Sequence, residues 1–127
     1  MRAILLAATL VFSGVNVITM ENEQVLRGYT VIVANGVIEE LGPMAEVPIP
    51  AGAHVVYGDG RWLMPGLIDM HVHARRADLG TYLRNGVTTV RDMAGTSWVM
   101  DAVRDVESGA VAGPRIIAAS RLIDGPT

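Results

Sequence analysis

Two residue types are missing from this chain, and each absence removes a class of site. The 127 residues include no cysteine, which excludes disulfide bonds and thiolate metal sites. They also include no lysine, so all ten positively charged side chains are arginine. The formal net charge is only -3, and the sequence contains no run of basic residues. We therefore expect no nucleic-acid partner.

Long hydrophobic runs are also missing. The apolar N-terminal stretch is interrupted by Ser13, Gly14 and Asn16, so it falls short of the roughly 18–20 apolar residues that span a bilayer. We therefore expect no membrane partner and a cytoplasmic protein. Residues 1–14 also resemble a secretory signal, because an arginine precedes the apolar stretch. If they act as a signal, the protein is secreted or periplasmic.

The first half of the chain has the pattern of short strands. Half of the whole sequence is apolar, which is enough to form a buried core. The clearest local signal is Asn35-Gly36, which lies between the β-branched stretches 30–34 and 37–41. Asn-Gly supplies the two positive-φ positions of a type I′ turn, so the sequence predicts a β-hairpin here.

The second half, after Pro65-Gly66, alternates between strand and helix patterns. Apolar residues predict a strand at Leu67–His71 that is covered on both faces. Two further strands, within 87–93 and 114–120, alternate with two helices, the second capped by Thr96 or Ser97. This βαβαβ order implies a parallel sheet with right-handed crossovers. Ligand sites of parallel α/β folds lie at the carboxyl ends of their strands.

Two of the three histidines, His71 and His73, stand one residue apart at the end of the first of these strands. Residues i and i+2 of a strand point to the same face. Both imidazoles then converge on one point, where they can hold a metal ion if other ligands arrive from elsewhere. Alone, such a pair is weak evidence for a metal site, because solvated histidines on an edge strand give the same pattern.

Three segments resemble one family. MPGLIDMHVH resembles the first barrel strand of the amidohydrolase superfamily, whose signature is a His-x-His at this place. YLRNGVTTVRDMAG is similar to the second helix–strand unit of its imidazolonepropionase-like branch. The segment around GYTVIVANGVIEELGP resembles the small β-sandwich that precedes the barrel in these enzymes. The three segments occur in the family's order, and the resemblance extends over nearly the whole chain.

This resemblance implies an α/β fold in two parts. Residues 1–62 would form the N-terminal part of a composite β-sandwich domain. Residues 63–127 would form the first βαβαβ units of an incomplete (β/α)8, TIM-like barrel of a metal-dependent hydrolase, truncated after the third strand. A closed barrel needs eight strands and typically about 250 residues, so we expect this to be the front part of a longer enzyme.

The resemblance also implies the chemistry. His71 and His73 would bind a divalent metal, most often Zn²⁺, with one or two ions in the full-length active site. Metal-bound water, acidified by the cation, would attack an amide, a cyclic amide or a dipeptide. The catalytic residues and the remaining ligands, commonly a carboxylated lysine, two histidines and an aspartate, are expected outside this chain. The isolated chain is therefore expected to be inactive.

Two further residues near the pair have open alternatives. Asp69 either orients a metal ligand or is a buried acid satisfied by the backbone or an arginine. Arg75 continues the alternation and, as in the dihydroorotase relatives, would grip a substrate carboxylate. The alternative for Arg75 is a solvated loop residue. For Asp92, which follows the second strand, a structural role is favoured over lining the pocket.

A second class of function stays open. The chain also fits a non-catalytic, β-rich binding module with a short α/β extension, which would be a cooperative monomer without metal. The enzyme interpretation instead predicts an exposed apolar edge around the unfinished barrel, and such edges seek partners. The full-length enzyme would act on a small molecule, and an oligomeric enzyme is compatible with the sequence.

Overall fold

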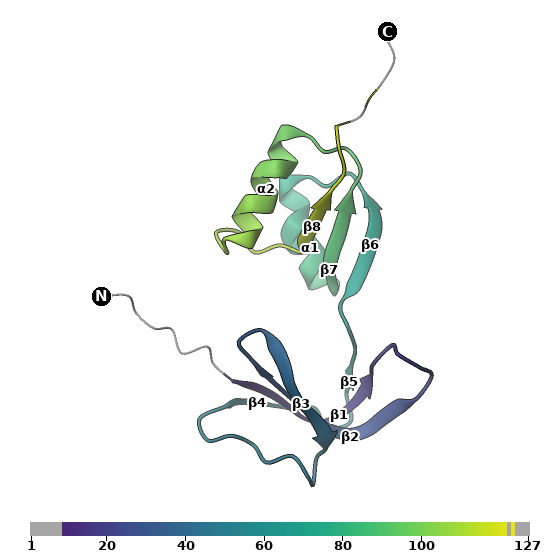
Figure 1. The fold of residues 1–127 in the computed structure, drawn as a ribbon, viewed down its shortest axis with the longest axis vertical. Coiled ribbons are helices and arrows are strands. Elements are labelled where there is room, and N and C mark those ends of the chain that lie inside the picture. Colours follow the sequence, from purple (N-terminus) through teal and green to yellow (C-terminus); the bar gives the residue numbers. More distant parts are fainter. Residues whose placement is uncertain (1–8, 122, 124–127) are drawn as a thin grey trace, which may run out of the picture. The chain divides into compact units, whose positions relative to one another are not determined.

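The computed structural model describes residues 9–121 and 123. The chain divides into two compact units, one up to Pro65 and the other from Gly66 (Figure 1). Most of the N-terminal segment that resembles a secretory signal, residues 1–8, lies outside the described part. Among the described residues, no helix is both long and apolar enough to cross a bilayer.

The first unit is built around one central strand. Strand β1 pairs with β2 in the antiparallel sense and with β4 and β5 in the parallel sense, and β3 continues the sheet beyond β2. All the described strands of this unit belong to one sheet, so the predicted β-sandwich stays a proposal. The strands are β1 (Leu10–Ile18), β2 (Val25–Ala34), β3 (Val37–Pro43), β4 (His54–Tyr57) and β5 (Trp62–Leu63).

A bulge in β1 lets this strand contribute to two apolar clusters. Its register against β2 shifts on both sides of Val15, and Gly14 adopts a φ of 70° there. Before the bulge, Val11 packs with Ile32 of β2; after it, Val15 packs with Val31. Val31 and Ile32 are neighbours on a strand and point to opposite faces. The bulge therefore moves the buried side chains of β1 from one face to the other.

The predicted hairpin is confirmed. Asn35 and Gly36 connect β2 to β3 with φ values of 54° and 76°, and Ala34 pairs with Val37 across the turn. Two consecutive positive φ values are the requirement of a type I′ turn, which matches the right-handed twist of the flanking strands.

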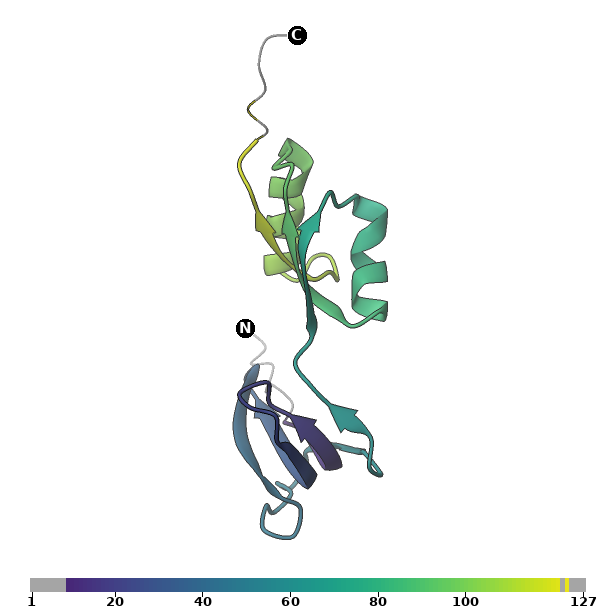
Figure 2. The same ribbon diagram turned by 90° about the vertical axis from the view of Figure 1, so that its right-hand side faces the viewer.

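The second unit has the predicted βαβαβ order. Its three strands form a parallel sheet in the order β6-β7-β8. Both helices pack on one face of this sheet (Figures 1 and 2). The elements are β6 (Leu67–Val72), a 3₁₀ turn (Arg76–Asp78), α1 (Leu79–Arg84), β7 (Val87–Asp92), α2 (Ser97–Glu107) and β8 (Arg115–Ala118).

The core of this unit lies between the sheet and the helices. Each strand contributes apolar side chains to it, and so do α1, α2 and the loop after β6. The buried members are Val72, Ala74, Leu79, Val90, Val99, Ala102 and Ile116. The mixed α/β class predicted from the sequence is therefore confirmed.

The expectation that β6 is covered on both faces is wrong for the described residues. Leu67, Ile68 and Met70 are 50%, 60% and 54% exposed. The reason is that β6 is an edge strand paired only with β7, and Val72 is its only residue in the core beneath the helices. An apolar run predicts burial only when neighbouring elements lie on both sides of the strand.

The hairpin turn yields a first prediction. An added Cβ at Gly36 would meet no atom within 4 Å, so Gly36→Ala tests the backbone conformation alone. We expect a loss of about 1–2 kcal/mol in the free energy of unfolding of the first unit, because a Cβ disfavours the left-handed region. Urea denaturation, followed by Trp62 fluorescence in a Trp98→Phe background, measures it. Asn35→Gly is the control and should not lower stability comparably; an unchanged Gly36→Ala midpoint would refute the turn assignment.

Candidate metal centre

The histidine pair lies at the carboxyl end of β6, and its two rings lie side by side in an edge-to-face arrangement. The ring centroids of His71 and His73 are 5.4 Å apart, with an interplanar angle of 68°. Val72, between them, is buried in the core under the helices. The two imidazoles thus leave the strand on the opposite side from Val72, as the alternation of a strand requires. Both histidines are exposed.

This arrangement fits part of a metal site. Neutral imidazoles are ordinary ligands of Zn²⁺, and a catalytic zinc site normally has three protein ligands plus water. Within residues 9–121 and 123, no group of three or more His, Cys, Asp or Glu side chains is placed to hold a metal ion. The chain therefore offers two neighbouring imidazoles, and a third ligand has to come from elsewhere.

The alternation that places His71 and His73 on one side of the strand does not determine the side on which Asp69 lies. The register between β6 and β7 shifts between Asp69 and Val72, which interrupts the period-two pattern between Asp69 and the pair. The Asp69 carboxylate accepts a hydrogen bond from the backbone N–H of His71, with a donor–acceptor distance of 3.2 Å. It thus contacts the backbone of His71, and its effect on a metal ligand stays a prediction.

Arg75 is held by a local partner. Its Nε donates to Oδ2 of Asp78 at 3.0 Å, and the same oxygen accepts from the Arg75 backbone N–H at 3.2 Å. The side-chain hydrogen bond lowers the pKa of Asp78 and raises the pKa of Arg75. The Arg75 side chain is 83% exposed. The pair closes the 3₁₀ turn before α1, and the predicted role of Arg75 with a substrate stays untested.

The buried acid of this region is Asp92, at the end of β7. It is 0% exposed, and its carboxylate accepts three backbone hydrogen bonds. Oδ2 accepts from the N–H of Ala74 at 2.8 Å, and Oδ1 accepts from the N–H of Ala94 at 2.9 Å and of Gly95 at 3.1 Å. The structural role favoured from the sequence is confirmed, but the sequence did not reveal the partners.

Gly95 shows how closely the turn after β7 approaches the chain after β8. It adopts a φ of 53°, and a Cβ there would collide with the backbone oxygens of Ala119 and Ser120. Only glycine satisfies both the conformation and the space. A glycine three residues after an acid at a strand end is the sequence signal that marks this turn.

The first unit carries an apolar hollow of a different character. Its volume is about 410 Å³, and it is lined mainly by aliphatic and aromatic side chains from β1, β2, β3 and β5, with Glu21 as its one ionisable residue. No histidine lines it. The hollow can accept an apolar group, but it has none of the donors that a metal centre needs.

Comparison with known proteins adds to this geometry. No family model matches the sequence. An adenine deaminase of Paracoccus denitrificans is 33% identical over 89 residues, which cover 65% of this chain and 15% of the relative. A dihydroorotase of Geobacter sulfurreducens is 42% identical over 81 residues (56% and 19%). An imidazolonepropionase of Pseudomonas entomophila is 40% identical over 50 residues (39% and 12%).

The structure of this chain is also similar to solved structures of proteins with related names. A crystal structure assigned as a prolidase of Bifidobacterium longum matches 96% of this chain with a TM-score of 0.88 and 30% sequence identity. The chain belongs to the amidohydrolase superfamily. Relatives with these names are hydrolases that act on carbon–nitrogen bonds. The chain spans about a third of that solved structure and less than a fifth of each of these curated relatives.

The Arg75–Asp78 pair yields a prediction on pH dependence. The folded pKa of Asp78 is below its ordinary value of 3.8, so the pair contributes to stability above that value. The contribution is lost as the pH falls through the lower, folded pKa. A carboxyl-detected NMR titration should give an Asp78 midpoint below 3.8, and Arg75→Ala should move it back upward. A midpoint that Arg75→Ala leaves unchanged would contradict the pairing.

Proposed function

We propose that the protein to which this chain belongs is a metal-dependent amidohydrolase that cleaves a carbon–nitrogen bond of a small amide, cyclic amide or dipeptide. His71 and His73 are two of its metal ligands. The observation that carries this proposal is the pair of adjacent imidazoles at the carboxyl end of β6, whose ring centroids are 5.4 Å apart. This is where parallel α/β folds place their ligands.

The proposal includes a finer assignment of the fold. Residues 63–127 would contain the first three strands of a (β/α)8 barrel, and residues 1–62 would be part of a β-sandwich. Helices on a single face of a parallel sheet support the barrel, because a barrel has its helices outside and side chains inside. The histidines then lie on the helix-free side, which becomes the interior.

The donor set suits zinc better than it suits magnesium or calcium. Imidazole nitrogens favour Zn²⁺ over Mg²⁺ or Ca²⁺, which take oxygen ligands. A bound zinc ion would supply an acidified water for attack on the carbonyl carbon. The chain's own contribution is to hold two imidazoles side by side at the end of β6, so that the ligands need little reordering when the metal binds. One or two ions per site agree with these two ligands.

The substrate class follows from the relatives and stays broad. One solved relative, 28% identical and with a TM-score of 0.76, is a prolidase complexed with N-methylphosphonate-L-proline. Together with the dihydroorotase, it supports an amide nitrogen in a small molecule that also bears a carboxylate. Arg75 is the proposed carboxylate contact, for which its guanidinium would exchange Asp78 for the substrate. Asp69 would steady His71 through the backbone.

The test is His71→Ala in the whole protein. Losing a direct ligand should lower zinc affinity by more than the 10–100-fold that changes around the ligands usually cost, and activity should fall with it. Zinc content after dialysis and turnover of a panel of dipeptides, N-acyl amino acids and cyclic amides measure both losses. Circular dichroism should show that the protein stays folded.

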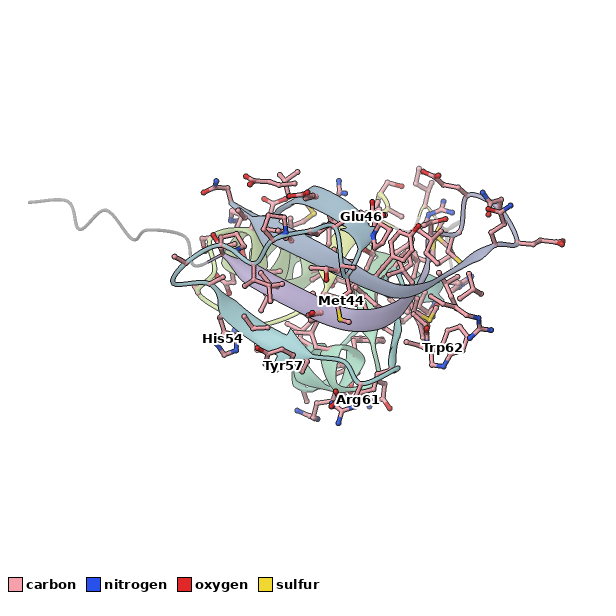
Figure 3. The ribbon with its side chains drawn as sticks, turned by 90° about the horizontal axis from the view of Figure 1, so that it is seen from below. Met44, Glu46, His54, Tyr57, Arg61 and Trp62 are labelled. Carbon is pink, nitrogen blue, oxygen red and sulfur yellow. The ribbon has the colours of Figure 1, made fainter. Side chains whose placement is uncertain are left out.

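His54→Ala is the matched control. His54 is the third histidine, exposed on β4 in the first unit (Figure 3), and its removal should change neither zinc content nor turnover. If His71→Ala retains its metal, the pair does not bind it. If the wild-type protein neither binds zinc nor hydrolyses any member of the panel, the alternative of a non-catalytic binding module is favoured.

A further inference from the structure

We infer that Asp92 is a positioning residue for the histidine pair, which it holds through the backbone and not through a metal. Its carboxylate fixes the chain directly after His73, so that the His73 ring lies beside the His71 ring. This inference rests on the proposed role of the two histidines as metal ligands.

The first support is the place of the hydrogen bond from Ala74. The loop after β6 leaves the sheet at His73, and the N–H of the next residue, Ala74, donates to Asp92 Oδ2 at 2.8 Å. Ala74 is 6% exposed and belongs to the core of the second unit. The bond therefore fixes the peptide that follows His73, and with it the direction in which this side chain leaves the backbone.

The second support is the weakness of the ladder at this point. The register of β6 against β7 is irregular between Asp69 and Val72. After Asp69, the ladder pairs only Val72, whose partner is Asp92, and the carbonyl of Val72 accepts from the N–H of Met93 at 2.9 Å. The carboxylate of Asp92 thus adds a constraint where the regular pairing of a sheet is interrupted.

The third support is that the backbone engages both oxygens of the carboxylate. Its two oxygens accept three backbone N–H bonds, and no salt bridge to Asp92 occurs among the described residues. Several backbone donors stabilise a buried carboxylate without a cation. Both oxygens point at the chain's own backbone, so Asp92 acts on the histidines as a fixed anchor.

Asp92 joins the ends of all three strands, through its carboxylate and its backbone carbonyl together. Oδ1 holds the turn after β7 through Ala94 and Gly95, and the backbone carbonyl of Asp92 accepts from the N–H of Ala119, just after β8, at 2.8 Å. The anchor for His73 is therefore rigid, because it belongs to a strand end that is itself bound on both sides.

Asp92→Asn separates these connections. An asparagine has one acceptor oxygen and one NH₂ group, which donates. Its oxygen keeps more bonds by facing Ala94 and Gly95, and its NH₂ group then faces the N–H of Ala74. Two donors cannot form a hydrogen bond with each other. The substitution therefore breaks the bond to Ala74, next to His73, and keeps the bonds to Ala94 and Gly95. Ile116→Ala is the matched control, because Ile116 is buried on β8 in the same core and its side chain has no hydrogen-bonding group.

The experiment measures zinc binding and amide exchange on the whole protein to which this chain belongs, with zinc alone as the probe. Asp92→Asn should weaken zinc binding by about 10–100-fold, the effect usual for residues that orient metal ligands. It should also speed hydrogen exchange at Ala74 more than at Ala94 and Gly95. Ile116→Ala should lower the melting temperature at least as much while leaving zinc affinity within about twofold of wild type.

The inference would be overturned if Asp92→Asn and the wild type had equal zinc affinities. It would also be overturned if Asp92→Asn and Ile116→Ala lost zinc affinity to the same extent. If the asparagine variant does not fold, the wild-type protein still decides: Ala74 must exchange as slowly as Ala94 and Gly95, and fast exchange at Ala74 refutes the anchor. Absence of zinc binding in the wild type, with a protected Ala74, refutes the proposed function and not the anchor.

Discussion

The second unit depends on one buried carboxylate. Asp92 is removed from water and has no ion-pair partner among the described residues, so its carboxyl oxygens depend on three backbone N–H groups for their hydrogen bonds. These donors come from the loop after β6 and the turn after β7. A carboxylate at the end of the middle strand can reach both sides at once, which an apolar residue there could not do.

The rest of the candidate site builds on this arrangement. With the end of β6 fixed, period-two alternation places His71 and His73 on one side and Val72 in the core on the other. Because both helices cover the face that holds Val72, the imidazoles remain on the free face. Arg75 begins the next element instead, where its bond to Asp78 closes the 3₁₀ turn. Within residues 71–75, the two histidines thus belong to the candidate metal site, whereas Arg75 stabilises the local fold.

The sequence predicted those features that depend on local geometry. Asn35-Gly36 defined its turn because few other residues accept two positive φ values in succession, and the histidine spacing defined their common face. Features that depend on distant partners could not be predicted in this way. The position of Asp69 is affected by a register shift against β7, the exposure of β6 by its place at the sheet edge, and the partners of Asp92 by the approach of separate loops.

The central claim is that His71 and His73 share one metal ion, and NMR of their side-chain nitrogens tests it most directly. Two-bond ¹H–¹⁵N spectra resolve the ring nitrogens of each histidine during a zinc titration of the ¹⁵N-labelled protein. The account predicts that one nitrogen of His71 and one of His73 shift together, with the same midpoint, while His54 does not change. Shifts with separate midpoints, or a response confined to one of the two rings, would contradict it.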